Sequence, residues 1–435
     1  MRRAAQQDSS RVMGKKELTK NSIIVFATTF ISSASTFIFQ IMMGRSMDMD
    51  SFGWFNVLIS IQLIFSVFTG ALILLFTHHA AMFWTLEEKG KLHGLYTSAW
   101  RIVAVIAVAS TCVVPLSSPL WMETLRIESI LSVILASLLI ASYFLQAVPL
   151  AFVRGMQKFH FFFYGLGGSG IFKVLLGALF IYMGITVEKA LFALILSVVL
   201  SIVLIHRLII PLFIGIPAKG VDVSREEMTS YGTRAVAAIF FPMFFINVDM
   251  ILVRSLFEPE ISGHYAAFGV FGKLIFLGGQ IVAVALFPAT VSGDTAKIPI
   301  GNDLIGRAIV LVLLGGGTAV ALSVAFPERI LYMLFKIDDP STAALLPYYC
   351  GFILAVSVLL IEANHRLARK QYGFLRVAII ASLLQVAGII HFSGSLENLL
   401  KFQLALFTAT AGVRVFSLLL DSREGLPVVR ENEGG

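Results

Sequence analysis

Two lysines lie deep inside long apolar stretches of this sequence, where a charged side chain is unusual. Lys273 is the only formally charged residue between Tyr265 and Pro288, and Lys173 is similarly isolated in the stretch GGSGIFKVLLGALF. If these stretches cross a membrane as helices, each ammonium group at the bilayer centre costs roughly 2.5–3.5 kcal/mol on insertion scales. Such a group could bind an anion in a water-filled cavity or pair with an acid, and the sequence leaves both interpretations open.

One acid has a comparable position. Asp249, in FFINVDMILV, lies well inside an apolar stretch, and Asn247 is two residues before it. A buried carboxylate of this kind could hold a coupling proton or sodium ion, or it could be the ion-pair partner of Lys273 or Arg254. The acid Glu362, in IEANHRLARK, is expected at a solvated helix end.

Uncharged polar residues follow one face of the first apolar stretch. Thr29, Ser33, Thr36 and Gln40 recur at helical spacing, and Gln62 occupies a similar setting in the second stretch. Such a stripe either lines a cavity or holds helices together. We find no metal-ligand spacing and no nucleophile–base motif in the sequence, so we expect no catalytic residues and no metal site.

The composition indicates a membrane protein that crosses the bilayer many times. Hydrophobic residues make up 57% of the 435 residues and charged residues 14%, whereas a soluble domain has about 25% charged residues. A helix needs about 20 apolar residues to cross a bilayer. We expect twelve such spans, at about 21–43, 52–76, 98–119, 128–152, 162–184, 188–210, 231–256, 261–290, 304–326, 342–364, 372–393 and 398–420.

The basic residues between the spans predict the orientation of the chain. The two tails and every second loop together hold 23 Lys and Arg residues, and the remaining loops hold seven. By the positive-inside rule both termini are cytoplasmic. Twelve spans agree with this, because an even number returns the chain to the side on which it started. The net charge of +7 is thus an orientation signal, and we do not expect a nucleic-acid partner.

The sequence also contains a weak internal repeat. RSMDMDSFGWF, which begins at Arg45, matches SLFEPEISGHY, which begins at Ser255, so that Gly53 aligns with Gly263 at an offset of 210 residues. RGMQKFH and RLARKQY match at a similar offset. Six spans per repeat predict two parallel six-helix lobes related by a pseudo-twofold axis along the membrane normal, with a substrate site between them.

The predicted fold is therefore an all-α polytopic membrane protein with five parts. These are a cytoplasmic N-terminal tail (1–20), an N-lobe (21–213), a cytoplasmic linker (214–230), a C-lobe (231–421) and a cytoplasmic C-terminal tail (422–435).

The span layout and one long passage resemble a known family. NVDMILVRSLFEPEISGHYAAFGVFGKLIFLGGQIVAVALFPAT is similar to Wzx-type polysaccharide (O-antigen) flippases of the multidrug/oligosaccharidyl-lipid/polysaccharide (MOP) exporter superfamily. The family-like features are Asp249, Gly263 with Tyr265, Lys273 and the closing pair 287–288. FVRGMQKFHFF, after the fourth span, is similar to the same family.

The resemblance implies a two-lobe transporter, not an enzyme, in the bacterial inner membrane. It would move an undecaprenyl-diphosphate-linked oligosaccharide to the outer leaflet by alternating access, for O-antigen, exopolysaccharide or capsule synthesis. We expect a monomer in the lipid bilayer that meets polysaccharide polymerase or assembly proteins. It would need no cofactor, with a coupling proton or sodium ion left open.

This interpretation gives each candidate residue a role. Lys273 and Lys173 would bind the diphosphate, whose charge needs fixed positive partners. Gln40, Gln62 and Asn247 would meet sugar hydroxyls, and Asp249 is the ion-coupling candidate.

Three alternatives remain. A multidrug or cation antiporter of the same superfamily would favour an acid in the first lobe, and the first span has none. Lipid II-type flippases typically carry more than twelve spans. A membrane glycosyltransferase or polymerase would need a long extracytoplasmic loop, which the expected span layout does not contain.

The predicted orientation can be tested by cysteine labelling in intact cells. Single cysteines introduced at Ser51 and Ser395 should react with a membrane-impermeant maleimide, because both positions precede extracytoplasmic helix starts. Cysteines at Gly90 and Gly220 should not react until the membrane is opened. External labelling at Gly220 would contradict the two-lobe arrangement.

Overall fold

The computed structural model describes residues 2–220, 236, 240–295, 302–369, 371 and 373–423, and every regular element in this part of the chain is helical. The elements of the first half are α1 (Arg2–Ser46), α2 (Met49–Thr85), α3 (Lys89–Ser117), η1 (Ser118–Leu120), α4 (Ile130–Gly155), α5 (Phe159–Phe162), η2 (Phe163–Gly167), α6 (Gly168–Tyr182), α7 (Val187–Ile209) and η3 (Ile210–Phe213). Those of the second half are α9 (Val248–Leu256), α10 (Pro259–Thr295), α11 (Asn302–Ala325), α12 (Pro327–Phe335), α13 (Pro340–Ala343), α14 (Leu346–Ala368), α15 (Phe374–His391) and α16 (Leu396–Arg423).

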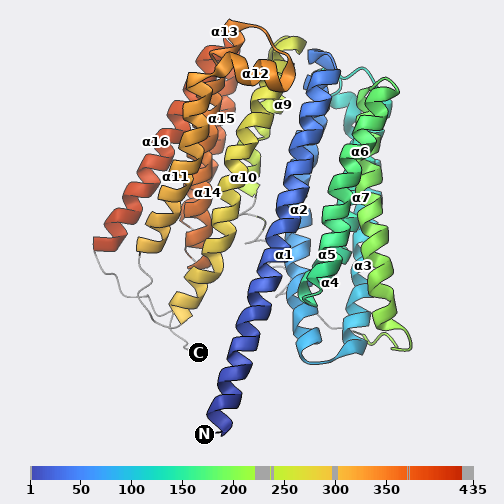
Figure 1. The fold of residues 1–435 in the computed structure, drawn as a ribbon. Helices are drawn as coiled ribbons and strands as arrows, with labels where there is room; N and C mark the ends of the chain where they lie inside the picture. The colour runs from blue at the N-terminus through green and yellow to red at the C-terminus, as the bar shows by residue number, and fades with distance from the viewer. Residues whose placement is uncertain are drawn as a thin grey trace, which may run out of the picture. The chain divides into compact units, whose positions relative to one another are not determined.

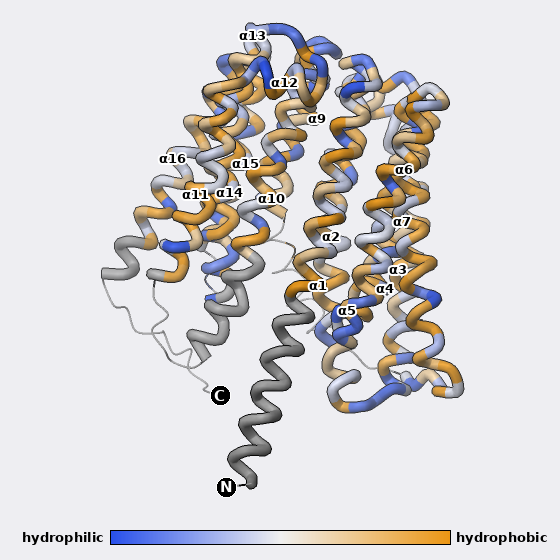
Figure 2. The backbone as a smooth tube through the Cα atoms, in the orientation of Figure 1, coloured by the Kyte–Doolittle hydropathy of each residue, from blue (hydrophilic) through white to orange (hydrophobic). Residues whose placement is uncertain are grey.

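Eleven helices in the described part are long and apolar enough to cross a membrane. They correspond to the expected spans except for the seventh, at 231–256, part of which lies outside the described residues. Within that span, residues 240–245 are helical, 246–247 form a turn, and α9 follows. Figure 2 shows hydrophobic residues along the helices and hydrophilic residues gathered in the segment that holds α12 and α13.

The chain divides into two compact units (Figure 1). The first comprises Met1–Ile239 and the first turn of α10, Pro259–Gly263; the second comprises Phe240–Glu258 and His264–Gly435. The boundaries of the lobes, linker and tails stay a prediction. Most of the predicted linker, most of the C-terminal tail and the side chains of the N-terminal tail lie outside the described residues.

The internal repeat is visible in the helix boundaries. Both α2 and α10 contain 37 residues, and their limits, Met49–Thr85 and Pro259–Thr295, differ by 210 at each end. Each of these helices is then followed by further long helices in the same order, α3, α4, α6 and α7 in the first half and α11, α14, α15 and α16 in the second. The sequence match at Gly53 and Gly263 therefore marks a repeated structural element.

In the first unit, α4 packs against α2, α3 and α7, while α1 packs against α6. Small residues allow several of these helices to approach each other closely. A Cβ at Gly155 of α4 would lie 2.7 Å from the Cβ of Ala80 in α2, and one at Gly170 of α6 would lie 3.2 Å from the Cα of Ser32 in α1. The glycine-rich stretch 165–170 thus serves close helix packing, as van der Waals association in lipid favours.

In the second unit, α14 packs against both α11 and α16. A column of aromatic rings fills the centre of this packing. The Phe407 ring lies 4.9 Å from that of Phe245 and 5.0 Å from that of Phe352, and the Tyr349 ring meets that of Tyr265 edge-on at 5.2 Å. Such edge-to-face pairs contribute beyond their buried area and fix the helices rigidly.

The two repeat-related glycines meet within the first unit. A Cβ on Gly263 would lie 2.0 Å from the carbonyl oxygen of Met49, and one on Gly53 would lie 2.2 Å from Oγ of Ser262. The first turns of α2 and α10 approach closely because neither glycine carries a side chain. The sequence match between the repeats therefore has a packing reason.

This contact predicts that even one methyl group is harmful at these glycines. Gly263→Ala should destabilise the protein by roughly 1–3 kcal/mol, the usual cost of forcing extra atoms into a packed site. Gly168→Ala is the matched control, since a Cβ there meets nothing within 4 Å, and it should be neutral or stabilising. Thermal unfolding in detergent checks both, and equal effects would contradict the close approach.

Candidate functional site

Lys173 is buried between α6 and α1 in the first unit, with 7% of its surface exposed. Its ammonium group donates to Oγ1 of Thr36 at 2.9 Å, and Thr36 in turn donates to the carbonyl oxygen of Ser32. Within the described part of the chain, no carboxylate lies within ion-pair distance of this ammonium group. The hydrogen-bond partner of this buried ammonium group is therefore a neutral hydroxyl group.

The predicted polar stripe on α1 provides further groups beside Lys173. Gln40 lies one turn beyond Thr36, is 9% exposed, and its Oε1 has no hydrogen-bond partner in the structure. Gln62, on α2, is also buried, but no hydrogen bond joins it to Lys173 or Thr36 in the described residues. The first unit thus brings Lys173 and the Thr36–Gln40 face of α1 together, and Gln62 shares no hydrogen bond with them in the described residues.

Asp249 is completely buried in the first turn of α9. The turn at residues 246–247 frees the Met250 N–H, which donates to Oδ1 of Asp249 at 2.8 Å. The Tyr265 hydroxyl donates to Oδ2 at 2.6 Å. A carboxylate at a helix N-terminus is favoured by the helix dipole, so the break in the seventh span creates the setting of this acid.

Lys273 lies on α10, two turns beyond Tyr265, and is partly buried. The positive charge of Lys273 interacts electrostatically with Asp249. No carboxylate in the described part of the chain, however, lies within ion-pair distance of the Lys273 ammonium group. The direct Lys273–Asp249 ion pair, one of the two interpretations from the sequence, is therefore not formed in this structure.

Asn247 is completely buried at the break before α9. Its Nδ2 donates to the Met243 carbonyl oxygen at 2.7 Å, and its Oδ1 has no partner. It therefore neighbours Asp249 in the chain but makes no hydrogen bond to it in the described structure.

The sequence analysis missed three neutral residues of the Asp249 cluster. Tyr265 was noted for the repeat and the family resemblance, not as a partner of Asp249. Gln403 lies 3.1 Å from its hydroxyl, and Gln385 donates to the carbonyl oxygen of Phe245 at 2.8 Å. Both glutamines are completely buried. Their positions inside predicted spans, where an amide needs a partner, were the available signal.

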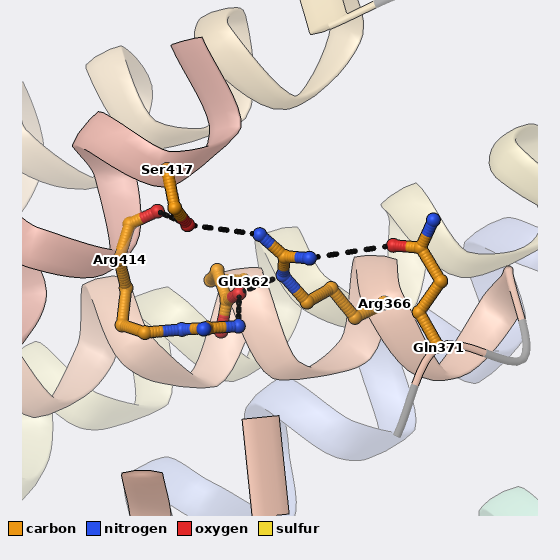
Figure 3. A network of polar contacts seen from close by, with 5 residues as sticks. All are labelled: Glu362, Arg366, Gln371, Arg414 and Ser417. Atoms are coloured by element: carbon orange, nitrogen blue, oxygen red, sulfur yellow. Dashed lines mark hydrogen bonds and ion pairs between the residues drawn. The ribbon is translucent and has the colours of Figure 1, made fainter. Parts of the chain in front are cut away.

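Glu362 is not at a solvated helix end, contrary to the sequence interpretation. It is 2% exposed and accepts hydrogen bonds from Arg366 and Arg414 (Figure 3). Arg366 also donates to Ser417 at 2.9 Å. These bonds tie α14 to α16, so the acid is paired across two helices that the sequence could not place side by side.

A small cavity adjoins this network. It has a volume of about 30 Å³, and its lining includes Pro242, Phe245, Glu362, Phe374 and Arg414. A water molecule needs about 10–15 Å³, so the space corresponds to two or three waters.

The described polar clusters contain groups that could bind an anion, exchange a proton or accept hydrogen bonds from a ligand. They contain two intramembrane ammonium groups without carboxylate partners, one acid held by neutral donors, and buried amide oxygens. No group of three or more metal-ligating side chains occurs among the described residues.

The comparisons identify the fold. No protein-family model and no curated protein matches the chain. An inward-facing MATE-family multidrug resistance transporter of the MOP superfamily matches with a TM-score of 0.71 and 13% identity, covering 91% of this chain and 96% of that chain. The inward closed form of the lipid II flippase MurJ matches with a TM-score of 0.65 and 16% identity, covering 93% and 88%.

A third match is a MOP-superfamily transporter from Pyrococcus furiosus, whose binding pocket is described as reversed in polarity. Its TM-score is 0.63 at 15% identity, with 94% of this chain and 96% of that chain covered. The chain has the fold of MOP-superfamily transporters. This confirms the predicted all-α, multi-pass membrane class, and the two-lobe arrangement agrees with these neighbours.

The Glu362 network predicts a large stability loss when the acid is neutralised. Glu362→Gln leaves Arg366 and Arg414 without their shared counter-charge and should cost about 3–5 kcal/mol, as breaking a buried ion pair does. Adding Arg414→Gln should restore part of the loss. Both are measured by thermal unfolding in detergent.

The control is Glu397→Gln, which breaks a half-exposed pair with Lys401 and should cost less than about 1 kcal/mol. A loss at Glu362 no larger than at Glu397 would contradict the structural role.

Proposed function

We propose that this chain is a flippase that moves an undecaprenyl-diphosphate-linked oligosaccharide from the cytoplasmic to the outer leaflet. The observation that carries the proposal is the pair of intramembrane lysines, Lys173 and Lys273. In the described part of the chain neither has a carboxylate within ion-pair distance. Such groups favour an anionic cargo, and a diphosphate is doubly suited because each phosphate accepts charge-assisted hydrogen bonds.

The neutral residues fit the sugar part of such a cargo. Gln40 and Asn247 each hold a buried amide oxygen without a hydrogen-bond partner, and Gln62 is buried in a membrane-spanning helix. Amides both donate to and accept from hydroxyl groups. We assign these three residues to the oligosaccharide and the two lysines to the diphosphate.

A multidrug or cation antiporter is the second candidate, because Asp249 is a buried acid and the MATE transporters share the fold. A cationic cargo would be repelled by Lys173 and Lys273, so we favour the anionic one. A lipid II-type flippase is the third candidate, and its cargo would also carry a diphosphate. The size of the sugar on the transported lipid would distinguish it from a flippase for lipid-linked oligosaccharides.

The proposal implies a setting. The protein would act as a monomer in the bacterial inner membrane with both termini in the cytoplasm. It would serve O-antigen, exopolysaccharide or capsule synthesis beside a polysaccharide polymerase and its assembly proteins. The chain itself would perform no covalent chemistry.

Replacement of Lys273 tests the cargo assignment. Lys273→Ala should leave abundance near normal, because removing a buried charge relieves its insertion cost, while transport of a labelled lipid-diphosphate sugar into proteoliposomes falls at least tenfold. Lys273→Arg should keep part of the activity, and Lys273→Glu none. Lys173→Ala combined with Lys273→Ala should abolish binding.

The matched control is Lys401→Ala, which removes a half-exposed, ion-paired lysine and should leave transport unchanged. Full transport by the Lys273→Ala, Asp249→Ala double variant would contradict the cargo role. Removing both charges restores the charge balance of the protein, but it does not restore an ammonium group that could bind the cargo.

Asp249→Asn tests ion coupling separately. The amide keeps the shape of the carboxylate but cannot exchange a proton or neutralise a cation. The variant should therefore accumulate in the membrane yet lose its response to an imposed proton or sodium gradient. Transport by the unaltered protein that ignores both gradients would contradict a coupling role.

A further inference from the structure

The Tyr265 hydroxyl is shared between two acceptor groups in the interior of the second unit. Its oxygen lies 2.6 Å from Oδ2 of Asp249 and 3.1 Å from Oε1 of Gln403. Tyr265 is 1% exposed, and Asp249 and Gln403 are fully buried. A hydroxyl carries a single proton, so it cannot donate to both neighbours at once.

The protonation state of Asp249 decides which neighbour receives the hydroxyl proton. When Asp249 is ionised, Tyr265 donates to Oδ2. When a proton binds to Oδ2, the carboxyl group donates to the Tyr265 oxygen, and the hydroxyl proton turns to Oε1 of Gln403. One proton is gained by Asp249, and none is gained or lost by Tyr265 or Gln403.

Gln403 can satisfy either arrangement by turning its amide. Its Nε2 has no hydrogen-bond partner in the structure, so nothing fixes the amide in one orientation. With Asp249 ionised, a turned amide donates from Nε2 to the Tyr265 oxygen, and with Asp249 protonated its Oε1 accepts the hydroxyl. Amide orientation follows the hydrogen-bond network around it. The Tyr265 hydroxyl therefore has a hydrogen-bond partner on both Asp249 and Gln403 in each state, and one amide atom of Gln403 stays without a partner.

Further groups in the described part of the chain also interact with Asp249 or lie close enough to feel its charge. The charge of Lys273 on α10 acts on Asp249, the charge of Asp249 acts on Tyr349 of α14, and α9 contributes the Met250 N–H. Both carboxylate oxygens already accept hydrogen bonds. A proton on Oδ2 uses the Tyr265 partner already in place, whereas a sodium ion would need several further oxygen ligands around Asp249.

We propose that Tyr265 and Gln403 are the positioning residues for a transported proton on Asp249, so that the coupling ion is H⁺ and not sodium. The inference rests on the proposed function, because it assigns the ion that drives it. Proton binding reverses the direction of the α9–α10 hydrogen bond between Asp249 and Tyr265 and of the α10–α16 hydrogen bond between Tyr265 and Gln403. The charge state of Asp249 is thereby transmitted to a third helix.

The first experiment measures transport of the labelled lipid-diphosphate sugar in proteoliposomes as a function of pH, with imposed proton or sodium gradients. The unaltered protein should respond to the proton gradient alone. Tyr265→Phe removes a hydrogen bond to the charged carboxylate, so the pH of half-maximal transport should rise by roughly one to two units. Tyr349→Phe removes a neighbouring hydroxyl without a hydrogen bond to Asp249 and should leave the profile in place.

A double-variant cycle separates a relay from simple packing. Gln403→Met keeps the volume but removes both amide groups, and it should alter the pH profile of the unaltered protein. In the Tyr265→Phe background it should alter nothing further, because the link to Asp249 is already lost. Equal effects of Gln403→Met in both backgrounds would overturn the proposal.

The second experiment needs no transport. Infrared difference spectra of the purified protein on acidification should show a carboxyl band that disappears in Asp249→Asn and shifts in Tyr265→Phe. An unshifted band in Tyr265→Phe would overturn the relay even if the protein moves no lipid-linked sugar. Transport driven by sodium alone would also overturn it, and would point to the free oxygens of Asn247 and Gln385 while leaving the flippase proposal intact.

Discussion

Every charge inside a membrane-spanning helix must be matched by an opposite charge, a hydrogen bond or water, because lipid offers none of these. The described part of this chain meets that requirement in three ways. Glu362 takes two arginines from α14 and α16, and Asp249 takes a tyrosine hydroxyl and a backbone N–H. Lys173 takes only a neutral hydroxyl, so its charge keeps capacity for a further partner.

The two repeats share their helix boundaries, but the charged residues inside the helices are not repeated. The positions related to Lys273 and Asp249 by the offset of 210 are Leu63 and Phe39, and Lys173 corresponds to Leu383. The two halves therefore share helix boundaries and glycine contacts while carrying different chemistry. In our proposal this asymmetry gives both units a cargo-binding cation and only the second an ion-coupling acid.

The second unit combines a rigid centre with an adjustable polar cluster. Aromatic rings of Tyr349, Phe352 and Phe407 pack tightly around α14, while Gln385 and Gln403 each keep one amide atom without a partner beside them. Rigid neighbours hold the distances between the polar atoms, and the unfilled hydrogen-bond capacity lets those atoms exchange partners. The proton response that we propose for Asp249 would use both properties.

The sequence by itself determined the membrane class, the long helices, the repeat and the isolation of Lys173, Lys273 and Asp249, because these follow from hydropathy and from spacing along one chain. It could not determine how the charges are partnered. Glu362 is near the end of its helix in sequence, yet it is buried and paired with Arg414 of α16. The Lys273–Asp249 ion pair, one of the two interpretations that the sequence left open, is not formed, and Asp249 accepts a hydrogen bond from Tyr265 instead. The break at residues 246–247 also has no unique sequence signal. Partners that lie far apart in the chain are brought together only when helices pack at a particular rotation and depth, and that choice depends on the summed contacts of whole helix faces.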